Sequence, residues 1–146
     1  MASQYKRLSH SVWLCKYHIV FCPKYRYKIL EGKAEVFVRN NLYRLCGQKD
    51  QVSIEEINIQ PDHVHLFIAA PPRLAPADMV QILKSISAKE VFKKFPRIRN
   101  QLWGGELWSN GYFVRAVGYK VTSFVIQRYI RYQDQEDHGK KQGKLF

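Results

Sequence analysis

Apolar and polar positions alternate along the first half of the chain in a way that is typical of β-strands. Between residues 12 and 22 the larger apolar side chains recur at every second position, which predicts a strand. Residues 52–59 show the same alternation, and residues 63–69 form a second, strongly apolar run. The Pro61-Asp62 turn between these two runs predicts a β-hairpin.

Apolar residues at helical intervals predict three helices. Residues 34–45 carry the first of them. The longest begins at Pro76 and continues until Pro96. Thr122 or Ser123 can cap a final helix through a side-chain hydroxyl.

The remaining segments link and follow these elements. Residues 97–109 have no clear periodicity and predict an irregular connection. Residues 112–117 predict a fourth strand, which Gly118 breaks. Residues 134–146 are polar and predict a frayed tail.

The order of these elements predicts an α+β fold. Strand, helix, strand, strand, helix, strand is the order of a ferredoxin-like αβ sandwich with an antiparallel sheet, and one extra C-terminal helix follows it. A length of 146 residues suits one domain and is enough to bury a core. We therefore expect residues 1–146 to form a single domain.

The charge balance points to a polyanionic partner. The chain has 24 lysines and arginines against 12 acidic residues, a formal net charge of +12. Nucleic acid is favoured over an anionic membrane surface, because the basic residues are scattered rather than gathered in one amphipathic helix or polybasic run. The chain has no apolar stretch of about eighteen residues and no secretory leader pattern, so we expect a cytoplasmic protein without a membrane partner.

A pair of histidines lies inside the apolar run of residues 63–69. His63 and His65 flank Val64, and alternation along a strand sends both imidazoles out from the same face. Two imidazoles side by side can hold a divalent ion, and Asp62 is close enough to orient one of them. The alternative is a pair of histidines on a solvated face of the sheet.

The final helix carries a second candidate pair. Tyr129 and Gln133 are four residues apart and therefore lie one turn apart on the same side of the helix. A tyrosine can act as a nucleophile, and a neutral amide can complete the ligand set of a metal ion. The alternative is a tyrosine of the core or its rim, since the chain has nine tyrosines.

Three strings together resemble one family. The strings PDHVHLFI, LWSNGYF and VIQRYIRYQ are similar to motifs of the HUH single-tyrosine transposases of the insertion-sequence two-hundred group. The likeness runs from about Tyr17 to Gln133. It implies that His63, His65 and Gln133 bind magnesium or manganese, although two imidazoles by themselves favour softer ions. It also implies that Tyr129 is the catalytic nucleophile.

The resemblance further implies a reaction and its partners. Such an enzyme cleaves and rejoins single-stranded DNA at insertion-sequence ends through a 5′-phosphotyrosine intermediate. The expected partners are single-stranded DNA with hairpin ends and a second copy of the chain, in a homodimer whose active sites are completed across subunits. Gly118 is a candidate hinge for the helix that carries Tyr129.

Other basic and aromatic residues are candidates for the DNA surface, although each can equally be an ordinary solvated charge or a packed ring. The candidates for phosphate contacts are Lys24, Arg26, Lys84, Lys89, Arg97 and Arg99, and those for base stacking are Tyr25, Trp103 and Trp108.

Three other functions remain open at this point. The chain could be a domesticated relative that processes chromosomal repeat hairpins. It could instead be a non-catalytic module that binds single-stranded nucleic acid, which would need neither histidine nor a metal. A replication-initiating HUH nuclease is disfavoured because such proteins are usually larger, with several domains.

Overall fold

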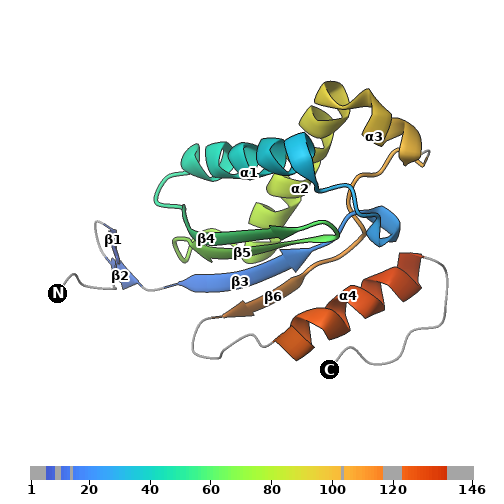
Figure 1. Ribbon diagram of the computed structural model, residues 1–146. Helices are drawn as coiled ribbons and strands as arrows, with labels where there is room; N and C mark the ends of the chain where they lie inside the picture. Colours follow the sequence, from blue (N-terminus) through green and yellow to red (C-terminus); the bar gives the residue numbers. More distant parts are fainter. Residues whose placement is uncertain (1–5, 9–10, 14, 103, 117–122, 138–146) are drawn as a thin grey trace.

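A four-stranded antiparallel sheet forms the centre of the molecule (Figure 1). The computed structural model describes residues 6–8, 11–13, 15–102, 104–116 and 123–137. The strands lie in the order β4-β5-β3-β6, and their bounds are Lys16–Phe21 for β3, Ser53–Gln60 for β4, His63–Ala69 for β5 and Phe113–Ala116 for β6. This strand order is that of a ferredoxin-like sandwich, so the predicted fold class is confirmed.

Helices cover both faces of this sheet. Helices α1 (Gly32–Gly47) and α2 (Pro76–Lys94) lie on one face, whereas α4 (Ser123–Asp137) lies on the other (Figure 1). Two short helical segments, η1 (Lys24–Arg26) and α3 (Pro96–Gln101), follow β3 and α2 respectively. The C-terminal helix expected beyond the ferredoxin-like unit is therefore α4.

The main core lies between the sheet and the α1/α2 layer. Alternate residues of β3 and β5 enter it, and Ile19, Phe21 and Leu66 are fully buried there. Leu42 of α1 and Leu83 of α2 pack against them from above. Because side chains alternate along a strand, the residues between these positions face α4.

A smaller cluster lies under α4. Val20, Cys22 and Phe113 of the sheet region pack there against Tyr129 and Ile130 of the helix. Burial raises the pKa of the Cys22 thiol to about 12, and this thiol remains protonated at neutral pH. Cys22 therefore packs as a small apolar residue.

Two predicted boundaries were wrong. The strand expected over residues 12–22 begins at Lys16, where its neighbour β5 ends at Ala69. Residues 11–13 form a separate strand, β2 (Ser11–Trp13), which pairs with β1 (Lys6–Leu8). The connection after Pro96, expected to be irregular, instead begins with α3, because proline suits the first turn of a helix.

The end of the chain also differs from the prediction. Residues 134–137 were expected in a frayed tail but continue α4, and the Asp137 side chain is 2% exposed. Residues 138–146, Trp103 and Gly118 lie outside the described residues, as does the proposed cap Thr122. Among the helices described, none is both long and apolar enough to cross a membrane.

Candidate active site

Both candidate histidines leave β5 on the face covered by α4. Val64, Leu66 and Ile68 of the same strand are completely buried in the main core, whereas His63 and His65 are half-buried on the opposite face. The predicted same-face arrangement of the two imidazoles is confirmed. It arises from strand alternation, since residues with odd numbers in this segment point away from α1 and α2.

An acidic side chain orients His63. The Nδ1 atom of His63 lies 2.9 Å from Oδ1 of Asp62, which confirms the expected contact between them. Asp62 also pairs with Arg26, whose Nε atom is 3.4 Å from Oδ2. When Nδ1–H donates to the carboxylate, Nε2 of His63 keeps a lone pair that can bind a metal ion.

A third histidine contacts His65. Nδ1 of His18, on β3, lies 3.1 Å from Nε2 of His65, and the His18 ring stacks on Phe67 at a centroid distance of 4.7 Å. Burial lowers the pKa of both imidazoles, and for His65 the neighbouring His18 and His63 lower it further. These shifts favour neutral rings. No pattern in the sequence indicated this role for His18, which lies two residues before Val20 on β3 and therefore points to the same face of the sheet.

Helix α4 brings Tyr129 to this same face. Val20 is the cross-strand partner of both His65 and Phe113, so these three residues form one row across the sheet. Tyr129 packs against Val20 and Phe113, with its ring centroid 6.1 Å from that of Phe113, and is 1% exposed. The helix therefore places the candidate nucleophile over the row that contains His65.

Gln133 lies one turn further along α4 and is 2% exposed. Its Nε2 atom would be 3.5 Å from a Cβ atom added at Gly111, whose φ is +83°. Lys84 holds the loop around Gly111 by donating hydrogen bonds to the carbonyl oxygens of Ser109, at 2.7 Å, and Gly111, at 2.8 Å. Gln133 therefore packs against this loop.

The C-terminal end of α4 is fixed by a buried carboxylate. Asp137 accepts a hydrogen bond from the backbone N–H of Tyr25, at 2.9 Å, and another from the hydroxyl of Ser109. The Nζ atom of Lys24 lies 3.6 Å from the other carboxylate oxygen. Asp137 had been assigned to the polar tail, and no pattern in the sequence indicated this role.

The ligands expected for a metal ion at this face are His63, His65 and Gln133. Within the described part of the chain, no three side chains of His, Cys, Asp or Glu are grouped to bind a metal. A metal at this face would therefore depend on two imidazoles and the Gln133 amide. The His65 Nε2 atom would have to give up its contact with His18 before it could coordinate an ion.

The six basic candidates for the DNA surface divide into two groups. Three of them have partners within the protein. Lys24 pairs with Glu106 and Asp137, and Arg26 pairs with Asp62. Lys84 donates hydrogen bonds to backbone carbonyl oxygens. Lys89, Arg97 and Arg99 are exposed.

The aromatic candidates described by the structure are not open platforms. Trp108 is 5% exposed, packs edge-on against Phe21 and donates a 2.9 Å hydrogen bond to Ser87. Tyr25 is half-buried, whereas its neighbour Tyr27 is 42% exposed. Tyr27 is therefore the more accessible ring of this pair.

Comparison with known sequences gives consistent matches over most of the chain. Residues 11–133 match the family described as IS200-like transposases. The chain is 33% identical over 126 residues to the ISDra2 transposase TnpA of Deinococcus radiodurans, covering 86% of this chain and 89% of the relative. It is 36% identical over 132 residues to the transposase of insertion sequence element IS200 from Salmonella typhimurium, covering 90% and 85%.

Solved structures show the same similarity. A crystal structure of a protein from Deinococcus radiodurans R1, assigned as a transposase, matches with a TM-score of 0.76 and 30% identity, over 88% of this chain and 97% of that one. A tyrosine transposase associated with REP sequences, bound to a REP hairpin, matches with a TM-score of 0.50 and 12% identity, over 94% and 75%. The second likeness concerns the fold alone.

Proposed function

Because this chain belongs to the family of IS200-like transposases, we propose that it cleaves and rejoins single-stranded DNA at insertion-sequence ends with Tyr129 as the nucleophile. One observation carries the proposal. His63 and His65 lie on β5 and Tyr129 lies on α4, and all three are on the side of the sheet that α4 covers.

The chemistry assigned to Tyr129 is an exchange of phosphate esters. Its phenolic oxygen attacks the scissile phosphorus, the bond to the 3′ oxygen breaks, and the DNA 5′ end becomes linked to the tyrosine. A 3′ hydroxyl then attacks the phosphotyrosine and restores both a phosphodiester and free Tyr129. A free phenol has a pKa of about 10, so the proton of Tyr129 must be removed at the site.

The proposed cofactor is magnesium or manganese, and the donor chemistry of the residues fits a divalent ion. His63 keeps Nε2 available because Asp62 engages Nδ1, and Gln133 supplies a neutral amide oxygen. Burial favours the neutral form of His65, which is the form that coordinates metals. When bound, the ion would polarise the scissile phosphate and stabilise the leaving 3′ oxygen.

The burial of Tyr129 requires a movement before DNA can react. At 1% exposure the phenol cannot meet a phosphate group while α4 packs on its own sheet. We propose that α4 leaves this position and completes the histidine site of a second copy, in a homodimer. Gly118, outside the described residues, stays a candidate hinge for this exchange.

The first experiment looks for the covalent intermediate. Purified protein is incubated with manganese and labelled single-stranded DNA that carries the hairpin-forming ends of its own element, and the products are separated on a denaturing gel. We expect a slow-migrating protein–DNA adduct that a chelator abolishes. Tyr129→Phe should form no adduct, whereas Tyr132→Phe, on the same helix, should retain it.

Failure of this experiment has a definite meaning. If DNA binds but no divalent ion yields an adduct, the chain acts as a nucleic-acid-binding module instead. If Tyr132→Phe removes the adduct and Tyr129→Phe does not, the nucleophile is misassigned.

A second experiment tests the dimer. The Tyr129→Phe variant is mixed with a His63→Ala/His65→Ala variant, and restored cleavage would support a site shared between subunits. Cleavage that never recovers would favour a site within one chain.

A further inference from the structure

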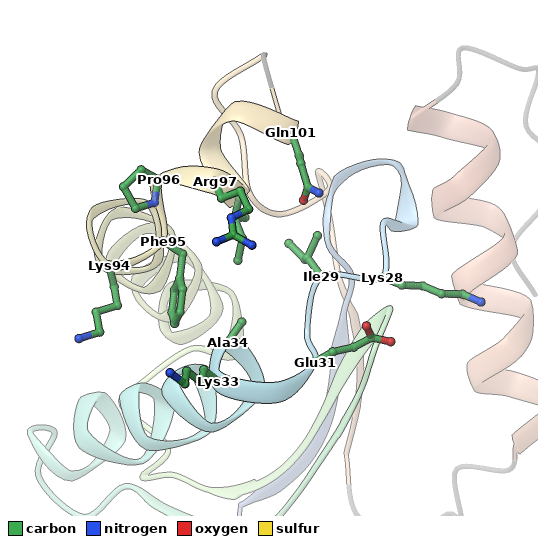
Figure 2. Close-up of a pocket in the computed structure, with 11 residues that line it drawn as sticks. Lys28, Ile29, Glu31, Lys33, Ala34, Lys94, Phe95, Pro96, Arg97 and Gln101 are labelled. Atoms are coloured by element: carbon green, nitrogen blue, oxygen red, sulfur yellow. The ribbon is translucent and has the colours of Figure 1, made fainter.

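A basic groove lies on the α1/α2 side of the molecule. The segment that leads into α1 faces the corner between α2 and α3 there (Figure 2), and the open space between them is about 580 Å³. We define the basic groove by its cations and the two side chains between them: Lys28, Lys33, Lys94 and Arg97, with Glu31 and Phe95. The groove thus has four cations and a single carboxylate.

Among the described residues, the groove cations lack the ion-pair partner that six cations elsewhere in the protein have. Elsewhere, ion pairs within 4 Å engage Lys16, Lys24, Arg26, Arg39, Arg44 and Arg73. Among the residues described, none of the four groove cations has an ion pair or a side-chain hydrogen bond. Their charge is therefore available to an anion from outside.

The side chains are also suitably directed. Figure 2 shows the Arg97 guanidinium in the middle of the group, between Phe95 and Ile29. Lys28 and Lys94 point outwards on opposite sides, and the Glu31 carboxylate lies toward Lys28, away from Arg97. An anion lying along the groove would therefore meet positive charge at its centre and at both ends.

The start of α1 adds to this positive field. Glu31 is the N-cap residue, and its side chain makes no capping hydrogen bond to the helix. Lys33 and Ala34, in the first turn, line the groove. The Ala34 N–H already donates to the Glu31 carbonyl oxygen at 3.2 Å, so the positive end of the helix dipole is what adds to the field of the four side-chain cations.

One chain segment connects the groove to the candidate active site. The backbone N–H of Leu30, next to the groove, donates a 3.1 Å hydrogen bond to the carbonyl oxygen of Pro61, two residues before His63. Earlier in the same segment, Arg26 pairs with Asp62. A strand of DNA held in the groove would thus leave it close to the end of the sheet where the histidines lie.

We propose that the basic groove binds backbone phosphates of the DNA substrate and anchors it outside the Tyr129 site. The proposal rests on the proposed function, because it takes the polyanion to be the DNA that the enzyme cuts. Backbone contacts carry charge but no sequence information, so the groove positions DNA without selecting a target. Phosphodiester groups spaced along a strand suit cations spread along a groove better than a single small anion does.

The test compares two variants that remove equal charge. Lys33→Ala/Arg97→Ala alters the groove, and Lys49→Ala/Arg73→Ala alters exposed cations away from it, of which Arg73 has an exposed ion pair with Asp50. Each is made in the Tyr129→Phe background, so that binding is measured without cleavage. Affinity for a fluorescent DNA hairpin with a single-stranded tail is measured by anisotropy at several salt concentrations, and melting temperatures confirm folding.

The groove variant should bind the hairpin at least about tenfold more weakly at 0.1 M salt, and its log–log salt slope should be less steep by about 2. The matched control should change affinity by less than about twofold, since exposed charges away from the DNA act only through the screened field. Should the groove variant lose stability, Lys28→Ala/Lys94→Ala provides the same test with Arg97 in place. Equal losses in groove and control variants would overturn the proposal.

Two further arms separate the possible explanations. In the first arm, binding of inorganic phosphate to the unaltered protein is measured. If phosphate binds in the groove and the groove variant keeps its DNA affinity, the groove is a site for a small anion and the proposal is overturned. With Tyr129 intact, the groove variant should need at least about tenfold more DNA than the unaltered protein to reach half of its maximal rate of adduct formation, and an unshifted DNA dependence would overturn the proposal. If the unaltered protein forms no adduct but groove-dependent binding persists, the proposed reaction fails and the groove assignment stands.

Discussion

Removing the Asp137 carboxylate should release α4 from the body of the protein. Asp137 accepts hydrogen bonds from the Tyr25 backbone and the Ser109 hydroxyl, and lies 3.6 Å from the Lys24 ammonium. Its side chain is 2% exposed, so water cannot replace these contacts while the helix is docked. In Asp137→Ala, the part-buried Tyr25 N–H loses this acceptor, and the Ser109 hydroxyl and the Lys24 ammonium keep only the Pro23 carbonyl oxygen and the exposed Glu106 carboxylate.

The size of the effect follows from this burial. Breaking a buried charged cluster by removing one partner costs about 3–5 kcal/mol. The cost should fall on the docking of α4 rather than on the main core, because the helix reaches the body through η1 and the small cluster that contains Val20. Amide exchange along α4 should then be faster by about 10² to 10⁴-fold.

The assay is hydrogen exchange by mass spectrometry, with α4 peptides compared against α1 peptides of the same protein. Glu106→Gln is the matched control, because Glu106 pairs with the same Lys24 at 3.2 Å but its side chain is 56% exposed. An exposed pair contributes about 0–1 kcal/mol, so this control should leave α4 protected. If Asp137→Ala and Glu106→Gln change α4 exchange equally, the carboxylate does not hold the helix.

Two other predictions concern side chains near the sheet. The substitution His18→Phe keeps a ring on Phe67 but removes the contact with Nε2 of His65. Manganese binding, measured by calorimetry, should therefore tighten by about two- to tenfold. Weaker binding would show that His18 orients His65 instead. Burial raises the pKa of Cys22 and Cys46 to about 12, so only ~1 in 10⁴ of these thiols ionises at pH 8. Half-exposed Cys15 should therefore react first with a thiol reagent, and mass spectrometry showing three equally fast thiols would contradict this.

The sequence predicted the parts of this protein that depend on local periodicity. Alternation over residues 63–69 was enough to place His63 and His65 on one face and to identify the hairpin, because a strand leaves no other choice for neighbouring side chains. Tyr129 and Gln133 were placed together by helical spacing in the same way. Their roles as nucleophile and ligand stay predictions.

Features that depend on distant contacts could not be predicted. His18 and His65 are 47 residues apart in sequence, and Asp137 and Tyr25 are 112 apart, so no local pattern indicates either contact. The start of β3 depends on where its neighbour β5 ends, which the residues of β3 do not encode. Lys24 was a candidate for phosphate contacts because its partners, Glu106 and Asp137, lie far from it in the sequence.

The alternation of β3 restricts how this protein can evolve. Ile19 and Phe21 fill the main core, while His18, Val20 and Cys22 face α4. Inserting or deleting one residue within the strand would turn the core-facing side chains toward α4 and the α4-facing ones into the core, which would disrupt the packing of the core and the histidine face together. Point substitutions can therefore accumulate along β3 during divergence, but a change in its length should be purged by selection.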